Sequence, residues 1–418
     1  MVAQDTRNPT EAADRHVEHA FIILFSLASI VAIAVTRTRV PYTVALVVVG
    51  LVVGSFHVID PPHLTKTLLF SLFLPGLVFE AAYNLHVSQL RRSWRAVTLL
   101  AGPGIVLAIA LAGLLIAWVL QVSGLRGDFT WKDGLVFAAL VSATDPISVV
   151  SLFRKIGVDP RLTTLVEAES LFNDGTAIVA LTLILAYVSG ASSGVAELTG
   201  RFVLVVCGGA VIGVAIGLFV ERVTQRINEP MVEITLTVIA AYGSFVVAED
   251  LHASGVIATV VAGLVLGTAR HTAFAEATRI AADAFWQYVA FALNSVVFLL
   301  IGFEVHPAAL LASLWPITVG FVAVVLTRAV VVAAVAGVLR GSSERMSAAW
   351  GALIAWGGLR GALAMVLALA LPPDFANRAL LVDMTFGVVI LSLLIQGLTI
   401  PLVTGTLLRH PATHLAAD

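Results

Sequence analysis

The sequence predicts an all-α protein that crosses a membrane many times. Of its 418 residues, 59% are hydrophobic and only 12% are charged, and the mean hydropathy is +1.00. Soluble chains carry roughly a quarter charged residues, so a water-soluble globule is excluded. The net charge of −2 leaves no basic excess for a nucleic-acid backbone. The single cysteine, Cys207, cannot form an intrachain disulfide or a metal cluster.

A helix needs about 20 mostly apolar residues to cross the hydrocarbon, and thirteen stretches of the chain meet this requirement. The segment before the first stretch has more acidic than basic residues, which is unlike a cleaved signal, so we expect an uncleaved first helix. The thirteen predicted spans are 18–36, 41–57, 64–83, 96–121, 132–153, 162–189, 200–222, 231–248, 254–268, 281–302, 315–339, 346–370 and 378–408.

The basic residues predict the orientation of these spans, because Lys and Arg concentrate in cytoplasmic loops. With the N-terminus outside, 15 of the 24 Lys and Arg residues fall on the inside and seven on the outside. We therefore expect an N-out, C-in protein with an extracytoplasmic segment 1–17, a transmembrane domain 18–408 and a short cytoplasmic tail 409–418.

Seven ionisable side chains lie deep within the predicted spans. A charge at the centre of a span costs roughly 3 kcal/mol on insertion scales, so each one needs a partner or a function. Five acids face two bases, which leaves at least one carboxylate for protons or cations. These residues are Glu80 in span 3, Asp145 in span 5, Glu167, Glu169 and Asp174 in span 6, Arg328 in span 11 and Arg360 in span 12.

Span 5 contains the segment Ser142-Ala143-Thr144-Asp145-Pro146. Pro146 has no N–H, so the carbonyl of Ser142 loses its helical donor. Unwound backbone at membrane depth is tolerated where it lines a cavity, and its free carbonyls can bind cations. The alternative is a proline kink in which Asp145 caps the following half-helix.

Span 6 carries a polar wall on an otherwise apolar helix. At 100° per residue, Glu167, Ser170 and Asp174 share one face, and Glu169 and Asn173 share an adjacent face. Spans 5 and 6 form an antiparallel hairpin in which Asp145 and Asp174 both lie about 13 to 20 Å from the inner face. The two aspartates can therefore meet near the midplane.

Span 12 contains Gly357-Gly358-Leu359-Arg360-Gly361, in which three glycines around a charge weaken the helix. Spans 1–6 and 8–13 form two halves of inverted topology, and interrupted span 5 corresponds to interrupted span 12. Paired broken helices in inverted repeats indicate a transport site at the midplane.

These segments, together with Thr327-Arg328-Ala329, resemble the signature segments of NhaP/NHE-type sodium/proton antiporters over essentially all thirteen spans. Phe79-Glu80 and the segment 249–255 are supporting matches. The resemblance implies a homodimer whose protomers have two domains. The core domain is expected from spans 4–6 and 11–13 (96–189 and 315–408), and the dimerisation domain from spans 1–3 and 7–10 (18–83 and 200–302).

The resemblance also implies roles for individual residues. Asp174 is expected to carry the cation and the proton, with Asp145, Thr144 and Ser170 as further Na+ ligands. Glu80 is a further candidate ligand, although its place near the end of span 3 would also let it reach interfacial water. Glu167 is assigned to the electrostatics of the entrance funnel. Residues expected to support the site are Pro146, Glu169, Asn173, Arg328 and Arg360.

Similar proteins pair a glutamate at the position of Glu169 with an arginine at the position of Arg328. Arg360 is a rival partner, and it could instead be a structural charge at the crossing of the broken helices. The sequence leaves these possibilities open.

We therefore expect exchange of Na+ or Li+ for H+ in sodium and pH homeostasis, at a prokaryotic inner (cell) membrane. Exchange is expected to be electroneutral, because Asn173 stands where electrogenic relatives carry an aspartate. The expected partners are monovalent cations, protons and the lipid bilayer, without enzymatic activity, cofactor, nucleotide or nucleic acid. K+/H+ exchange and an ion-binding sensor with a transporter fold are the alternatives. An intramembrane aspartyl protease is disfavoured because its Gly-x-Gly-Asp segment is absent.

Overall fold

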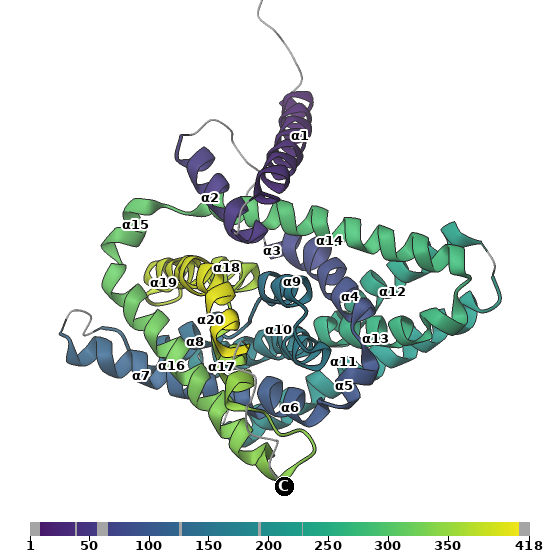
Figure 1. Cartoon of the computed structure of the whole chain (residues 1–418). Coiled ribbons are helices and arrows are strands. Elements are labelled where there is room, and N and C mark those ends of the chain that lie inside the picture. Colours follow the sequence, from purple (N-terminus) through teal and green to yellow (C-terminus); the bar gives the residue numbers. More distant parts are fainter. Residues whose placement is uncertain are drawn as a thin grey trace, which may run out of the picture.

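The computed structural model describes residues 9–37, 40–56, 66–124, 128–190, 194–227 and 229–408. Helices dominate these residues, which contain no strand (Figure 1). Seven helices are long and apolar enough to cross a membrane, and three shorter apolar helices accompany them. The chain is therefore a multi-pass membrane protein. The predicted tail 409–418 and residues 1–8 of the predicted N-terminal segment lie outside the described residues.

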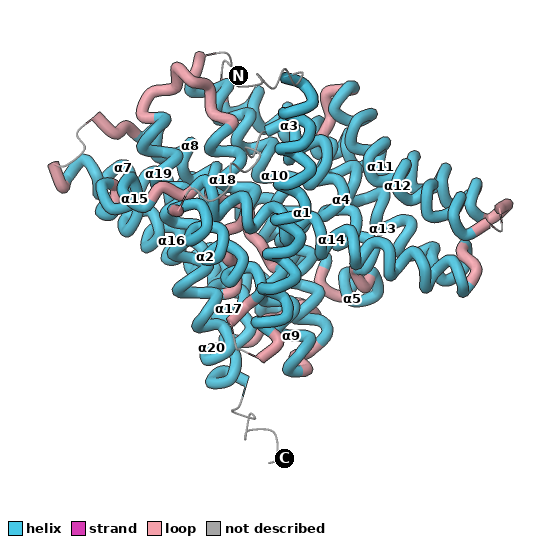
Figure 2. The backbone as a smooth tube through the Cα atoms, turned by 90° about the horizontal axis from the view of Figure 1, so that it is seen from above, coloured by secondary structure: helices cyan, strands magenta, loops and turns pink. Residues whose placement is uncertain are grey.

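One group of helices packs around α13 and α14; of these, α4, α11, α12 and α13 lie to the right of the central helix α10 (Pro160–Val188) in both views (Figures 1 and 2). The helix α14 packs against α1, α2 and α4, and α13 packs against α4, α11 and α12. The group consists of α1 (Pro9–Val35), α2 (Tyr42–Ser55), α3 (Lys66–Leu68), α4 (Leu74–Asn84), α11 (Val195–Thr224), α12 (Pro230–Asp250), α13 (Gly255–Ala273) and α14 (Glu276–Glu304).

A tight turn joins α12 to α13 within the segment 249–255. The Glu249 carboxylate accepts a hydrogen bond from the backbone N–H of Gly255 at 3.0 Å, and the Ser254 hydroxyl accepts one from the N–H of Ile257 at 3.3 Å. These side chains satisfy N–H groups that the first turn of a helix leaves without partners. Glu249 and Ser254 in this segment therefore stabilise the start of α13.

A second group of helices is built around α16, with α7 packed on α8 and α16, and α19 packed on α16 and α18 (Figure 1). Thr130 and Asp133 form a reciprocal capping box that begins α8. The group consists of α6 (Trp94–Leu99), α7 (Ile105–Val122), α8 (Trp131–Leu140), α9 (Ile147–Ile156), α16 (Leu314–Val338), α17 (Ala348–Trp356), α18 (Ala362–Leu369), α19 (Arg378–Leu391) and α20 (Leu398–Leu408).

Some elements differ from the sequence-based expectation. Helix α1 begins at Pro9 and not at residue 18, because its first turns are polar and a hydropathy criterion detects only its apolar part. Two short helices, α5 (Val87–Arg91) and α15 (Pro307–Ala312), lie in segments that were expected to be loops. Three helical pairs, α3–α4, α6–α7 and α19–α20, are continuous through π-helical turns at Leu69–Phe73, Leu100–Gly104 and Ser392–Gly397.

Two non-helical segments lie at the centre of the second group. Helix α8 ends at Leu140 and α9 begins at Ile147, while α17 ends at Trp356 and α18 begins at Ala362. The two segments meet, because the backbone N–H of Asp145 donates to the carbonyl of Leu359 at 2.8 Å. This meeting point lies beside α10 and positions the candidate site.

Candidate ion-binding site

Arg360 satisfies the carbonyls at the end of α8. Its Nη1 donates to the carbonyl oxygens of Ser142 at 2.7 Å and Ala143 at 3.4 Å, and its backbone N–H donates to the Ser392 hydroxyl at 3.0 Å. Carbonyls at a helix C-terminus carry partial negative charge, which a cationic side chain stabilises. The carbonyl of Ser142, which Pro146 frees from helical bonding, is thus held by protein donors.

Asp145 combines two roles that the sequence left as alternatives. Its Oδ1 accepts a hydrogen bond from the backbone N–H of Ile147 at 3.0 Å, so it caps the start of α9. Its side chain also lines a cavity. A Cβ atom at position 361 would collide with the Asp145 side chain, so Gly361 is needed for the close approach of the two non-helical segments.

Hydroxyl and amide groups fasten α10 to the segment after α8. The Thr144 hydroxyl donates to the Ser170 hydroxyl at 3.1 Å, and the Ser170 hydroxyl donates to the Thr144 carbonyl. Asn173 donates through Nδ2 to the Ser142 carbonyl at 3.1 Å and to the Thr144 hydroxyl at 3.2 Å. The backbone of residues 142–144 is therefore fixed against α10.

One cavity of about 130 Å³ brings together all the predicted ion-binding residues. Its volume is ample for a cation with water molecules, each of which needs roughly 10–15 Å³. Helices α4 and α14 form one wall of this cavity, and α10 with the two non-helical segments forms the opposite wall. The polar residues that line it are Glu80, Thr144, Asp145, Glu167, Ser170, Asp174 and Asn294.

The acids of this cavity are not equivalent. Glu167 is paired with Arg154, whose Nη2 lies 2.9 and 3.0 Å from the two carboxylate oxygens. Glu80 accepts a hydrogen bond from Asn84 at 2.8 Å. Among the residues that the structure describes, none donates a hydrogen bond to the Asp174 carboxylate. A carboxylate without a donor in such a place must either bind a proton or have a cation beside it, because the cost of desolvating its negative charge is otherwise not offset.

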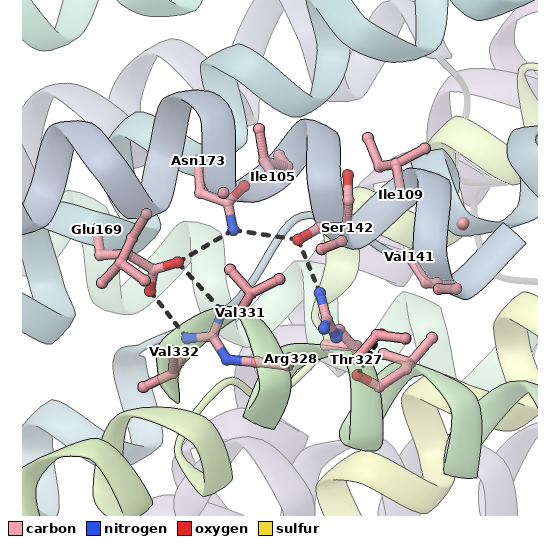
Figure 3. A pocket seen from close by; sticks show the side chains of 17 residues that line it. Ile105, Ile109, Val141, Ser142, Glu169, Asn173, Thr327, Arg328, Val331 and Val332 are labelled. Atoms are coloured by element: carbon pink, nitrogen blue, oxygen red, sulfur yellow. Dashed lines mark hydrogen bonds and ion pairs between the residues drawn. The ribbon is translucent and has the colours of Figure 1, made fainter. Parts of the chain in front are cut away.

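The adjacent face of α10 carries a buried ion pair, shown in Figure 3. Arg328 donates from Nη1 and Nη2 to the two oxygens of Glu169 at 3.1 and 3.0 Å, and the two side chains are only 11% and 3% exposed. Its Nε and Nη2 also donate to the Ile354 carbonyl at 3.3 and 3.1 Å. Arg328, and not its rival Arg360, is therefore the partner of Glu169.

The two faces of α10 separate two groups of charges. Glu169 and Asn173 border a small cavity of about 30 Å³ together with Arg328 and Arg360 (Figure 3), whereas Ser170 and Asp174 border the larger cavity. This division follows the 3.6-residue period of the helix. The two arginines therefore act on the backbone and on Glu169, and neither lines the cavity that contains Asp174.

Comparison with known proteins identifies the family. The model of the family described as "Sodium/hydrogen exchanger, transmembrane" matches residues 22–405. The chain belongs to this family. Members of the sodium/hydrogen exchanger family are transporters and not enzymes.

Two relatives of this exchanger chain are cyanobacterial antiporters. The low-affinity Na+/H+ antiporter NhaS1 of Synechocystis sp. is 37% identical over 403 residues, which cover 94% of this chain and 75% of the relative. The Na+/H+ antiporter ApNhaP of Aphanothece halophytica is 36% identical over 396 residues, covering 93% and 74% of the two chains. The solved sodium proton antiporter MjNhaP1 of Methanocaldococcus jannaschii shares the fold, with a TM-score of 0.72, 19% identity and coverage of 93% and 99%.

The structure adds residues to the candidate site that the sequence did not indicate. Asn294 of α14 lines the larger cavity, but an uncharged amide in an apolar helix carries little signal. Arg154 pairs with Glu167, although its place at the end of a predicted span suggested only a solvated charge. Both residues contribute to the site only because of how their helices pack, which the sequence alone does not show.

Proposed function

We propose that this chain exchanges Na+ or Li+ for H+ across the membrane by competition of cation and proton for Asp174. The observation that carries the proposal is the Asp174 carboxylate in the larger cavity, without a donor among the described residues but beside oxygen-bearing side chains. Hard monovalent cations bind oxygen ligands, and the same carboxylate binds a proton. A group that holds one or the other couples the two fluxes. The names of the relatives support the same activity.

We further propose that the chain crosses the membrane thirteen times with its N-terminus outside. The composite helices α3–α4, α6–α7 and α19–α20 count as one span each, as do the interrupted pairs α8–α9 and α17–α18. The single helices α1, α2, α10, α11, α12, α13, α14 and α16 supply the remaining eight. The distribution of basic residues supports the N-out orientation, and the family and the relatives support a cell-membrane location in a prokaryote.

The two groups of helices support a division into a dimerisation domain and a core domain. The larger cavity is lined from one side by α4 and α14 and from the other by α10 and the two non-helical segments. In the proposed cycle, the core carries Asp174 past α4 and α14, so that the cavity opens to each side of the membrane in turn. A homodimer would hold the first group still during this motion.

Purified protein in liposomes that contain a pH dye tests the proposal. An external pulse of Na+ or Li+ is expected to raise the internal pH as protons leave in exchange. A response to K+ alone would replace the proposal with K+/H+ exchange. Cation binding by the purified protein without any flux would indicate an ion-binding sensor.

Exchange is expected to be electroneutral, with one proton for one monovalent cation. Asn173 cannot titrate, and Glu169 and Glu167 are each paired with an arginine, which stays protonated in proteins. Asp145 and Glu80 also line the cavity, and in the proposed cycle both keep their protonation state while Asp174 alone exchanges its proton for the cation. Imposing a K+/valinomycin potential on the liposomes should leave the exchange rate unchanged. A rate or a reversal gradient that follows the potential would mean that Asp145 or another group carries a second charge.

A further inference from the structure

A chain of hydrogen bonds leads away from Glu80 to residues that do not line the cavity. Asn84, one turn further along α4, donates from Nδ2 to Glu80 Oε1 at 2.8 Å. The Asn84 Oδ1 accepts a hydrogen bond from Nη1 of Arg270 on α13 at 3.1 Å. The same Nη1 lies 3.3 Å from Oδ1 of Asp283 on α14. Arg270 of α13 therefore contacts both the Asn84 amide on α4 and the Asp283 carboxylate on α14.

The chemistry of arginine fixes the orientation of this amide. A guanidinium group has only donors, so the Asn84 atom that faces Arg270 must be the carbonyl oxygen. The NH2 group is then directed to Glu80. Rotating the amide by 180° would place a donor against Arg270 and an acceptor against the Glu80 carboxylate. Both contacts would be lost, so Asn84 presents a fixed donor to Glu80.

Arg270 is itself well anchored. It forms an ion pair with Asp283, its guanidinium carbon lies 5.3 Å from the ring centroid of Tyr83, and its side chain is only 17% exposed. Cation–π contacts and ion pairs of this kind restrict an arginine side chain. The donor that Asn84 offers is thus held by groups on α4, α13 and α14.

Apart from Asn84, the charged and amide groups around Glu80 are three acids, one amide and an arginine that is already paired. Glu167, Asp145 and Asp174 line the same cavity, and Arg154 is engaged with Glu167. The group contributed by α14 is the neutral amide of Asn294. Among the described residues, Asn84 makes the one hydrogen bond to the Glu80 carboxylate. Without it, a flexible glutamate would be free to leave the acidic cavity.

We propose that Asn84 and Arg270 are positioning residues that hold the Glu80 carboxylate in the cavity opposite Asp174. The inference rests on the proposed exchange at Asp174 and extends it to residues outside the cavity. A carboxylate held in place before the cation arrives loses less side-chain freedom on binding, which increases affinity. The apparent affinity for the cation should therefore depend on Asn84, whereas the maximal rate should not.

Asn84→Ala in liposomes is expected to raise the Na+ concentration for half-maximal exchange by about tenfold, the lower end of the range for groups that orient metal ligands. The maximal rate should change little. Arg222→Ala is the matched control, because Arg222 is exposed on α11 and its Nη1 donates to the Leu218 carbonyl of the same helix at 3.4 Å. This control should behave as wild type.

Asn84→Asp provides a second variant in case Asn84→Ala is not folded. The carboxylate can still pair with Arg270, so the helices stay fastened, but when ionised it cannot donate to Glu80. It should raise the half-maximal concentration at least as much as Asn84→Ala. A folded Asn84→Asp protein with wild-type affinity would overturn the inference.

A double-mutant cycle separates positioning from general structural support. In a Glu80→Ala background, which should already weaken affinity, Asn84→Ala is expected to add nothing, because the side chain that accepts its hydrogen bond is gone. Additive losses, or wild-type affinity in Glu80→Ala, would contradict the positioning role. If the wild-type protein exchanges no cation for protons, the proposed function fails. If the wild-type protein does exchange them and Asn84→Ala has unchanged affinity, only the role of Asn84 and Arg270 fails.

Discussion

Replacing Asp174 with asparagine is expected to reduce cation-driven proton movement to the level of protein-free liposomes. The amide has nearly the same shape as the carboxylate but can neither release a proton nor supply the negative charge that binds a cation. Asp174 is the carboxylate of the larger cavity for which the described residues supply no donor. The other acids of the cavity each have a hydrogen-bond partner, because Glu167 pairs with Arg154, Asp145 caps α9 and Glu80 accepts from Asn84.

The Asp174→Asn protein should remain folded. The substitution removes a desolvated charge, so the melting temperature in detergent should be no lower than that of the wild type. Asp374→Asn, at an exposed position between α18 and α19, is the matched control and should exchange normally. Undiminished exchange by Asp174→Asn would show that the carrier is another group.

Single alanine substitutions of Glu169 or Arg328 are expected to destabilise the protein strongly. Removing one partner of a buried ion pair leaves the other charge desolvated, which typically costs about 3–5 kcal/mol. Both side chains are almost inaccessible, and Arg328 also supports the Ile354 carbonyl before the second non-helical segment. The loss should appear as a lower melting temperature and lower expression, more than as weaker cation affinity.

An exposed ion pair supplies the control for this stability experiment. Arg201 and Glu197 on α11 lie 2.7 Å apart with 57% and 35% of their side chains exposed, and such pairs contribute only about 0–1 kcal/mol. Arg201→Ala should therefore melt close to wild type. Equal melting temperatures for Arg328→Ala and wild type would contradict a structural role for the buried pair.

Helical periodicity and spacing were sufficient to predict which polar residues of α10 line the same cavity. The 3.6-residue repeat placed Ser170 and Asp174 on a different face of α10 from Glu169 and Asn173, and the two cavities divide them in the same way. The equal depth of Asp145 and Asp174 predicted that they could meet, and both line one cavity. These features depend on single helices and on one hairpin.

The depth of a residue in the membrane does not predict which way its side chain points around the helix axis, so the partners of the arginines could not be predicted. Arg328 and Arg360 were both plausible partners for Glu169, and only the position of Arg328 on α16, within reach of Glu169 and of the Ile354 carbonyl of α17, distinguishes them. Arg270 and Arg154 stand near the ends of predicted spans, where a solvated side chain is the default expectation. Their partners come from helices distant in sequence.

Sodium accumulation driven by a proton gradient tests the central claim most directly. Liposomes containing the protein are prepared with an acidic interior and diluted into alkaline buffer with radioactive Na+. We predict that Na+ accumulates inside above its external concentration, that a protonophore with valinomycin and K+ abolishes the accumulation, and that Asp174→Asn shows none. Na+ uptake that merely equilibrates, or that is unaffected by collapsing the proton gradient, would contradict exchange of Na+ for H+ at Asp174.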